Sequence, residues 1–319
     1  MNNPVDPQAG GVPVIDIAPF LANAAQAKER VAAALGQACE QIGFLTITGH
    51  GVSLEQIERT AAIARAFFDL PLDEKLRLAM TEAGAGYSPL KEETLAASLG
   101  RPTPADIKES LNVSHNFDLT PWPARPAELR PALTAYFEAM NRLASDLMRI
   151  FALALALPEN YFAGKIHPSS SFLRIINYPP PVSDPEPGQL RAGAHTDYGT
   201  LTILRSENVA GGLQVRNRAG AWLDVQVPPD AFVVNLGDMM MRWTNDRWVS
   251  TLHRVVNPPA ALREASRRQS LVFFHNPNSD AVVECLPGCC GADNPARYPP
   301  ITAGEFIAQK SRKAYGAGT

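Results

Sequence analysis

The sequence predicts an α+β fold in which a closed β core of the double-sheet jelly-roll type, a double-stranded β-helix, follows a helical and mixed N-terminal region. Apolar residues recur at helical spacing through much of the first half of the chain. Between residues 171 and 284, short runs rich in Val, Ile, Leu, Phe and Thr alternate with clusters of Gly, Pro, Asn and Asp, as in closed all-β domains. A last helical pattern near the C-terminus predicts a flanking helix.

The composition is that of a globular protein with one large domain or two smaller ones, since 45% of the 319 residues are hydrophobic and 19% are charged. The 29 basic and 32 acidic residues give a net charge of -3, so nothing favours nucleic acid or a membrane surface as the main partner. Residues 1–11, expected to be flexible, lack signal-peptide features, and no apolar run is long enough to cross a bilayer. We therefore expect a cytoplasmic protein, and the oligomeric state is not predicted.

The N-terminal region is predicted to alternate helices with short strands. The spacing of Val31, Leu35 and Cys39 indicates an amphipathic helix over residues 21–42. His50 stands between two glycines at a strand end, which favours a turn or core histidine over a metal ligand. The other elements expected here are strands at 13–17 and 43–51 and helices at 54–68 and 73–80.

Residues 81–125 show no periodic pattern and contain several Gly and Pro residues, which predicts a long connection with short strands. Connections of this kind often line binding sites. Tyr87, Lys108, Ser110 and Asn112 are therefore candidates for substrate contacts. The alternative for each of them is a solvated loop.

Residues 126–157 carry one apolar stripe at helical spacing, which predicts a long helix, or two abutting ones, that backs a sheet. Thr302 and Glu305 have the spacing of a capping box, so a final helix is expected to begin there and to pack outside the β core. The strands expected in between cover 173–178, 200–204, 213–216, 221–224, 232–235, 250–256, 270–274 and 281–284. The resulting division of the chain is an N-terminal region at 12–165, a jelly-roll core at 166–290 and a C-terminal helix at 291–319.

His195 and Asp197 lie two residues apart in a segment with the character of a strand, so their side chains are expected on one face. An imidazole beside a carboxylate needs one more histidine to form the facial site of non-heme Fe(II) oxygenases. Alone, the two residues can equally be an ordinary surface pair.

Two later histidines compete for the third position. His253 lies in a strand-like run after enough intervening chain for several strands. His275 ends the run that begins at Arg268, and strand alternation places it on the face opposite to Arg268 and Ser270. If Arg268 and Ser270 face the cavity, His275 does not, and His253 is the favoured ligand.

Arg268 and Ser270 make a pair that suits a carboxylate. The guanidinium can bind both oxygens while the hydroxyl donates a third hydrogen bond. Because an unpaired Arg inside a barrel is costly, the pair implies an anionic ligand or a buried acidic partner.

Cys285, Cys289 and Cys290 cluster in the sequence, which raises the alternative of a thiolate metal site. No Cys or His nearby supplies a fourth ligand at zinc-site spacing, so we interpret them as loop or buried thiols. Four cysteines in so long a chain do not make a disulfide framework.

Several short segments carry a resemblance to a known family. They are Gly43-Phe44, Gly49-His50-Gly51, Tyr178-Pro179-Pro180, His195-Thr196-Asp197, Asn235-Leu236-Gly237-Asp238, Thr251-Leu252-His253-Arg254-Val255, Arg268-Gln269-Ser270 and Tyr298-Pro299-Pro300-Ile301-Thr302. In content and order they resemble the isopenicillin N synthase-like family of Fe(II) oxygenases, most of which depend on 2-oxoglutarate. The resemblance covers nearly the whole chain.

The resemblance implies roles for named residues. It makes His195, Asp197 and His253 the iron ligands, and it makes Arg268 and Ser270 the clamp on the distal carboxylate of 2-oxoglutarate. Tyr178 would add a hydrogen bond to the same cosubstrate, although plant members usually have Asn-Tyr-Tyr where this chain has Ile176-Asn177-Tyr178. Two further candidates, as pocket walls or as plain core residues, are Tyr198 and Phe274.

The implied activity is hydroxylation or desaturation of a small-molecule metabolite, with O2 consumed and succinate and CO2 formed as coproducts. One alternative is an Fe(II) oxidase of the same family that does not use 2-oxoglutarate and whose Arg-x-Ser pair binds the substrate carboxylate. A second is a non-catalytic jelly-roll protein that binds an anion. Succinate formation separates the first alternative from the main hypothesis, and metal analysis separates the second.

Overall fold

The structure is a computed structural model, and it describes residues 11–100, 103–167 and 169–315. Apart from Gly11, the N-terminal segment expected to be flexible lies outside the described residues. The division of the chain into three regions stays a prediction. Strands from both the first and the second of those regions take part in the main sheet.

The core of the molecule is an eight-stranded sheet. All of its neighbouring strands are antiparallel except the first two, which are parallel. In spatial order the strands are β1 (Val14–Asp16), β2 (Phe44–Thr48), β10 (Phe232–Leu236), β7 (Leu201–Ser206), β12 (Arg268–His275), β5 (Phe172–Tyr178), β4 (Glu109–Ser114) and β3 (Gly86–Ser88).

A second, smaller sheet contains β6 (Ala192–His195), β11 (His253–Val255), β8 (Leu213–Arg216) and β9 (Trp222–Asp224), in that order. A separate two-stranded sheet pairs β13 (Val282–Val283) with β14 (Ile301–Thr302). The predicted combination of a β core with flanking helices is confirmed.

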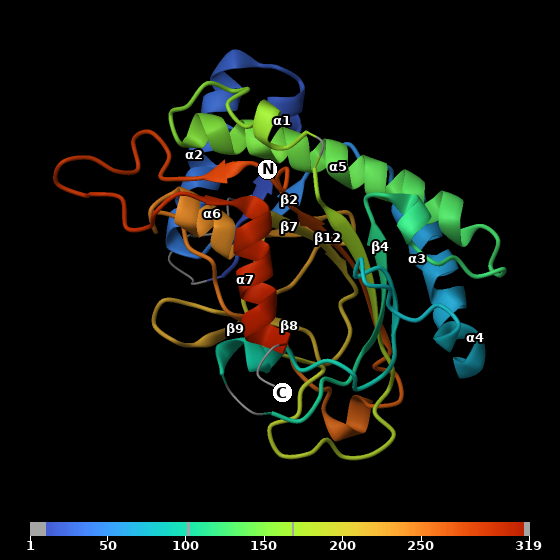
Figure 1. The fold of residues 1–319 in the computed structure, drawn as a ribbon. Coiled ribbons are helices and arrows are strands. Elements are labelled where there is room, and N and C mark those ends of the chain that lie inside the picture. Colours follow the sequence, from blue (N-terminus) through green and yellow to red (C-terminus); the bar gives the residue numbers. More distant parts are fainter. Residues whose placement is uncertain (1–10, 101–102, 168, 316–319) are drawn as a thin grey trace, which may run out of the picture.

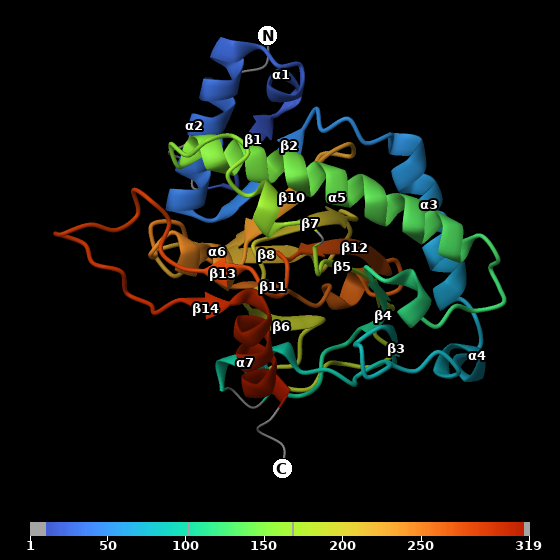
Figure 2. The ribbon, with the colours of Figure 1, turned by 45° about the horizontal axis from the view of Figure 1, so that its top comes forward.

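Three helices cover one face of the large sheet: α2 (Ala25–Gln41), α3 (Leu54–Phe68) and α5 (Leu129–Ala154). Figures 1 and 2 show α5 running across the sheet between the other two. Its apolar stripe, which includes Leu133, Met140 and Leu147, is fully buried and belongs to the same hydrophobic cluster as the outward side chains of β7 and β12. The prediction of a long helix that backs a sheet is therefore confirmed, and the opposite face of the sheet is left for a cavity.

The remaining helices are short, except for the last. They are α1 (Ala18–Leu21), α4 (Leu72–Leu76), α6 (Asp238–Trp243), α7 (Ala303–Tyr315) and the 3-10 turns η2 (Leu95–Leu99), η3 (Phe117–Leu119), η4 (Ala163–Lys165) and η5 (Ala260–Leu262). Within the described residues, none of the helices has the length and apolar character needed to span a membrane.

The structure divides one predicted helix and locates the short strands of one predicted connection. The helix expected over 21–42 is interrupted at Asn23, whose φ of 59° belongs to the left-handed region, so α1 and α2 are separate. The segment 81–125, predicted to be a long connection with short strands of unstated position, contains β3 and the six-residue β4, which pairs with β5. Its Leu111 and Val113 pack in the helix-covered core, whereas its alternate side chains are polar and buried, which hid the strand from a search for apolar runs.

The C-terminal helix begins as predicted, and two of its residues reach the central cavity. The Glu305 amide donates to Thr302 Oγ1 at 3.3 Å, and the Thr302 amide donates to Glu305 Oε2 at 3.3 Å, which completes the capping box. The helix packs against η2 and β14, and its Ile307 and Ser311 also line the central cavity. In Figure 1, α7 lies in front of the β core.

Candidate active site

The three predicted metal ligands come together at one point. His195 ends β6, Asp197 lies two residues beyond it, and His253 opens β11, where it is the register partner of His195. Asp197 Oδ1 lies 3.9 Å from His195 Nε2 and 3.7 Å from His253 Nε2. One ligand atom from each residue fits within 4.8 Å of the others, and these three residues are the only group of this kind among the described part of the chain.

Neighbouring groups orient each of these side chains. Asp197 Oδ2 accepts hydrogen bonds of 2.6 Å from Thr202 Oγ1 and from Asn235 Nδ2, which leaves Oδ1 turned toward the two imidazoles. The Nδ1 atoms of His195 and His253 lie 2.8 Å and 3.2 Å from the carbonyl oxygens of Gly193 and Thr251. Since a carbonyl only accepts, Nδ1 carries the proton and Nε2 keeps its lone pair, as a metal ligand requires.

The electrostatics match the same role. Burial, with the nearby His253, lowers the pKa of His195 to about 3, so the imidazole is neutral at physiological pH. Although burial acts to raise it, the pKa of Asp197 is lowered by His253 and His195 and by its hydrogen bonds to Asn235 and Thr202. A neutral imidazole and an ionised carboxylate are the protonation states in which these side chains bind metal.

Arg268 and Ser270 lie side by side on the cavity face of β12, as strand alternation predicts. Arg268 is 1% exposed, and its guanidinium carbon lies 5.0 Å from the centre of the Tyr178 ring on β5. Its Nη2 donates to Ser206 Oγ and its Nε donates to the Glu207 carbonyl at 3.3 Å.

Two buried donors remain unused at this end of the cavity. Arg268 Nη1 and Ser270 Oγ have no hydrogen-bond partner among the described residues. Leaving such groups unpaired costs free energy, and a carboxylate would satisfy both of them at once. The residues present therefore fit an organic acid held at the end of the cavity marked by Tyr178.

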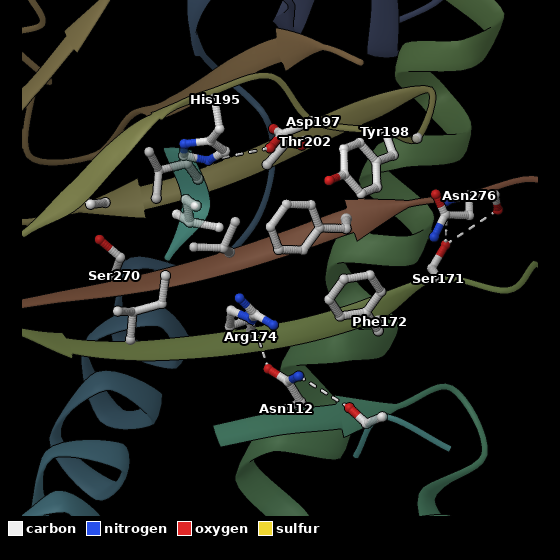
Figure 3. A pocket seen from close by; sticks show the side chains of 18 of the residues that line it. Asn112, Ser171, Phe172, Arg174, His195, Asp197, Tyr198, Thr202, Ser270 and Asn276 are labelled. Atoms are coloured by element: carbon white, nitrogen blue, oxygen red, sulfur yellow. Dashed lines mark hydrogen bonds and ion pairs between the residues drawn. The ribbon is translucent and has the colours of Figure 1, made fainter. Parts of the chain in front are cut away.

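A cavity of about 510 Å³ contains both the histidine cluster and the Arg268 pair. Four predicted substrate or wall residues line it: Lys108, Asn112, Tyr198 and Phe274. Figure 3 shows Asn112 and Tyr198 in this cavity together with Arg174 and Phe172, which were not predicted. Both of these lie on β5 at even spacing from Tyr178, so the alternation argument applied to that strand would have found them.

The prediction that Tyr87 contacts the substrate is wrong, because Tyr87 does not line the cavity. It pairs in register with Leu111, and both face the helix-covered core instead of the cavity. Its hydroxyl donates to the buried carboxylate of Glu109, and its ring packs edge-on against Phe67 of α3. Ser110 on β4 is buried as well and is not among the residues that line the cavity. Tyr87 therefore has a structural role.

The competing metal-site interpretations are not supported within the described residues. His275 is fully buried, and its Nδ1 lies 2.7 Å from Thr200 Oγ1, away from the cluster, as alternation predicts. His50 is a turn histidine whose Nε2 lies 2.8 Å from the Asp230 carbonyl. The three clustered cysteines form no group with a third or fourth ligand.

Comparison with known proteins decides the family. Residues 12–132 match the family described as the N-terminal part of non-haem dioxygenases in morphine synthesis, and residues 170–277 match the 2OG-Fe(II) oxygenase superfamily. A 2-oxoglutarate-Fe(II) type oxidoreductase of Emericella nidulans is 34% identical over 95% of this chain and 90% of its own. The chain belongs to the 2OG-Fe(II) oxygenase superfamily.

Other relatives of this oxygenase agree. A homoarginine-6-hydroxylase of Oryza sativa subsp. japonica is 30% identical over 94% of this chain and 96% of its own. A full-length Neurospora crassa protein, solved in complex with alpha-KG and thymine, superimposes with a TM-score of 0.87 at 30% identity, covering 98% of this chain and 100% of its own. Alpha-KG is 2-oxoglutarate, so a close structural relative binds the cosubstrate that the resemblance implied.

The family, the jelly-roll core and the cofactors are thus confirmed. The protein is a 2-oxoglutarate-dependent non-heme iron dioxygenase that uses Fe(II), 2-oxoglutarate and O2. The two alternatives, an oxidase without 2-oxoglutarate and a non-catalytic anion-binding protein, are not favoured by these relatives. The cytoplasmic location stays a prediction.

Proposed function

We propose that His195, Asp197 and His253 hold the iron of this oxygenase, and that Arg268 and Ser270 hold the distal carboxylate of 2-oxoglutarate. The observation that carries the second assignment is the pair of unpartnered buried donors, Arg268 Nη1 and Ser270 Oγ, in the same cavity as the histidine cluster. With both sites filled, each buried donor and each Nε2 lone pair has a partner.

When bound, iron with 2-oxoglutarate and O2 supplies the oxidation of a substrate C–H bond, with succinate and CO2 as coproducts. The protein's own residues bind and orient. Thr202 and Asn235 fix the Asp197 carboxylate through Oδ2, so that Oδ1 is presented in one direction. Tyr178 lines the cavity, and its ring flanks the Arg268 guanidinium beside the carboxylate site.

Apolar side chains keep water from the region between the two ends of the site. Ile176 of β5, Leu204 of β7 and Val272 of β12 line the cavity and are less than a tenth exposed. Apolar walls of this kind strengthen the electrostatic contacts of the charged groups inside. They also leave the substrate to be bound beyond them, on the side of Arg174 and Asn112.

The substrate is a small metabolite in this proposal. Relatives are named for hydroxylation of homoarginine, and a structural relative is solved with thymine. Neither nucleic acid nor a membrane is proposed as a partner, because the net charge is only -3. A cytoplasmic location is also part of the proposal.

The test is conversion of 2-oxoglutarate to succinate by the iron-loaded protein, screened for stimulation by candidate metabolites. We expect slow turnover alone and faster turnover with the right substrate, and no turnover by His195→Ala. Failure of the iron-loaded wild-type protein to bind 2-oxoglutarate would overturn the proposal. Unchanged metal affinity in His195→Ala would overturn the ligand assignment.

A further inference from the structure

The part of the cavity in which the substrate is proposed to bind carries two cationic side chains whose chemical role the proposal above does not state. Lys108 and Arg174 both line the cavity, and their side chains are only 3% and 13% exposed. Figure 3 shows Arg174 pointing into the cavity next to Asn112. Buried cations are rare unless paired, so the partners of these two need to be identified.

A single carboxylate oxygen serves both cations. Glu93 Oε2 accepts from Lys108 Nζ and, at 3.1 Å, from Arg174 Nη1. Arg174 Nε donates to Asn112 Oδ1 at 2.8 Å. Arg174 Nη2 has no acceptor among the described residues, and Lys108 Nζ uses one of its three hydrogens there. Hydrogen-bond donors are therefore in excess at this wall.

The acidic groups lie behind the wall and not on its surface. Glu93 does not line the cavity, nor does the nearby Asp106, whose carboxylate accepts the amides of Leu95 and Gly193. Of the described residues that line the cavity, the only carboxylate is Asp197, which is assigned to the metal. A ligand in this part of the cavity therefore meets positive charge, and a free ammonium or guanidinium group would find no acidic partner there.

This wall is separate from the site proposed for 2-oxoglutarate. On β5, Arg174 pairs in register with Val272, whereas Tyr178 pairs with Arg268. Four residues of strand separate the two levels, or about 13 Å. Phe172 and Phe274 follow at the next level from Arg174, with their rings stacked at 4.7 Å and 19°. Cations and an aromatic wall thus adjoin each other.

We propose that the primary substrate is an organic acid whose carboxylate pairs with Arg174 and Lys108 and whose flat apolar body packs against Phe172 and Phe274. A planar guanidinium and an ammonium with spare donors suit a carboxylate, and aromatic side chains suit a flat apolar body. This inference rests on the proposed function, since it places a substrate beside the assigned metal ligands.

The experiment uses matched pairs of probes that differ only in charge: benzoate and benzamide, phenylacetate and phenylacetamide, cinnamate and cinnamamide. The full chain is loaded with Mn(II) and 2-oxoglutarate, so that binding is measured without turnover, by thermal shift and then by calorimetry. We expect acids to bind and their amides to bind roughly tenfold or more weakly. For the best acid, Arg174→Met and Lys108→Met should each weaken binding by roughly tenfold to a hundredfold.

Matched variants keep the result interpretable. Arg174→Lys keeps the charge without the planar fork and should fall between wild type and Arg174→Met. Arg130→Met removes an arginine that is 51% exposed and pairs with Asp118 at the surface, and it should bind acids as wild type does. Affinity for 2-oxoglutarate, measured on every variant, reports whether the fold and the cosubstrate site are intact.

The inference is overturned if amides bind as well as acids, if no acid binds, or if Arg174→Met binds acids like wild type. In each of those cases, intact binding of 2-oxoglutarate leaves the proposed function standing. Loss of 2-oxoglutarate binding in the wild-type protein would instead count against the proposed function itself.

Discussion

Replacing Arg268 by Met tests how the protein holds its cosubstrate. Arg268 is 1% exposed, and its Nη1 has no partner among the described residues. Met keeps much of the length of the side chain but removes the guanidinium. The carboxylate of 2-oxoglutarate would then be buried with only Ser270 and Tyr178 beside it. Removing one partner of a buried charge pair costs about 3–5 kcal/mol. At about 1.4 kcal/mol for each factor of ten, the affinity for 2-oxoglutarate should fall by roughly a hundredfold to a few thousandfold.

The assay is calorimetric titration of the Mn(II)-loaded protein with 2-oxoglutarate. Ser270→Ala removes one hydrogen bond to a charged group, worth about 1.5–3 kcal/mol, so its loss of affinity should be smaller than that of Arg268→Met. The affinity for Mn(II) alone should stay as in wild type for both variants, because neither residue is assigned to the metal. Unchanged affinity for 2-oxoglutarate in Arg268→Met would show that Arg268 does not hold the distal carboxylate.

Three further predictions concern the support of the site and the core. Asn235→Ala removes the 2.6 Å hydrogen bond to Asp197 and should weaken Mn(II) binding by roughly 10–100-fold, measured by a titration followed by electron paramagnetic resonance. Mn(II) affinity equal to that of the wild-type protein would contradict the orienting role of Asn235. Tyr87→Phe loses the hydrogen bond to Glu109 and should lower the free energy of unfolding in urea by about 1–3 kcal/mol. A changed KM for the substrate would instead indicate that Tyr87 contacts the substrate. Leu147→Ala, at a fully buried position of α5, should cost about 2–5 kcal/mol in the same urea assay, and a cost near zero would mean that α5 does not pack on the sheet as described.

The residues proposed for the metal and the cosubstrate could be grouped from sequence because most of them lie on strands. Alternation along a strand placed Arg268 with Ser270 and turned His275 away, and the structure agrees with both. Asp197 came with His195 even though β6 ends at His195, since only two residues separate them. For residues two apart on or beside a strand, the local backbone geometry is enough to place both side chains on the same side.

The substrate side could be predicted only in part, because it depends on how separate segments pack. The irregular composition of 81–125 did not reveal the position of β4, whose Asn112 and Ser114 line the cavity. All three residues of β3 are buried, so the sequence around Tyr87 did not show which side of this strand faces the helices and which faces the cavity. Likewise, the capping box located the start of α7 but did not show that Ile307 lines the cavity. A capping box is a local pattern, whereas the position of a helix depends on its tertiary packing.

The most direct test of the account is metal stoichiometry measured together with 2-oxoglutarate binding. Titration of the metal-free chain with Mn(II), with and without 2-oxoglutarate, should give one metal site per chain and tighter 2-oxoglutarate binding once the metal is present. In the double variant His195→Ala/His253→Ala, both effects should disappear while the thermal unfolding transition remains cooperative. Stoichiometric metal binding that survives in this variant would contradict the assignment of the site.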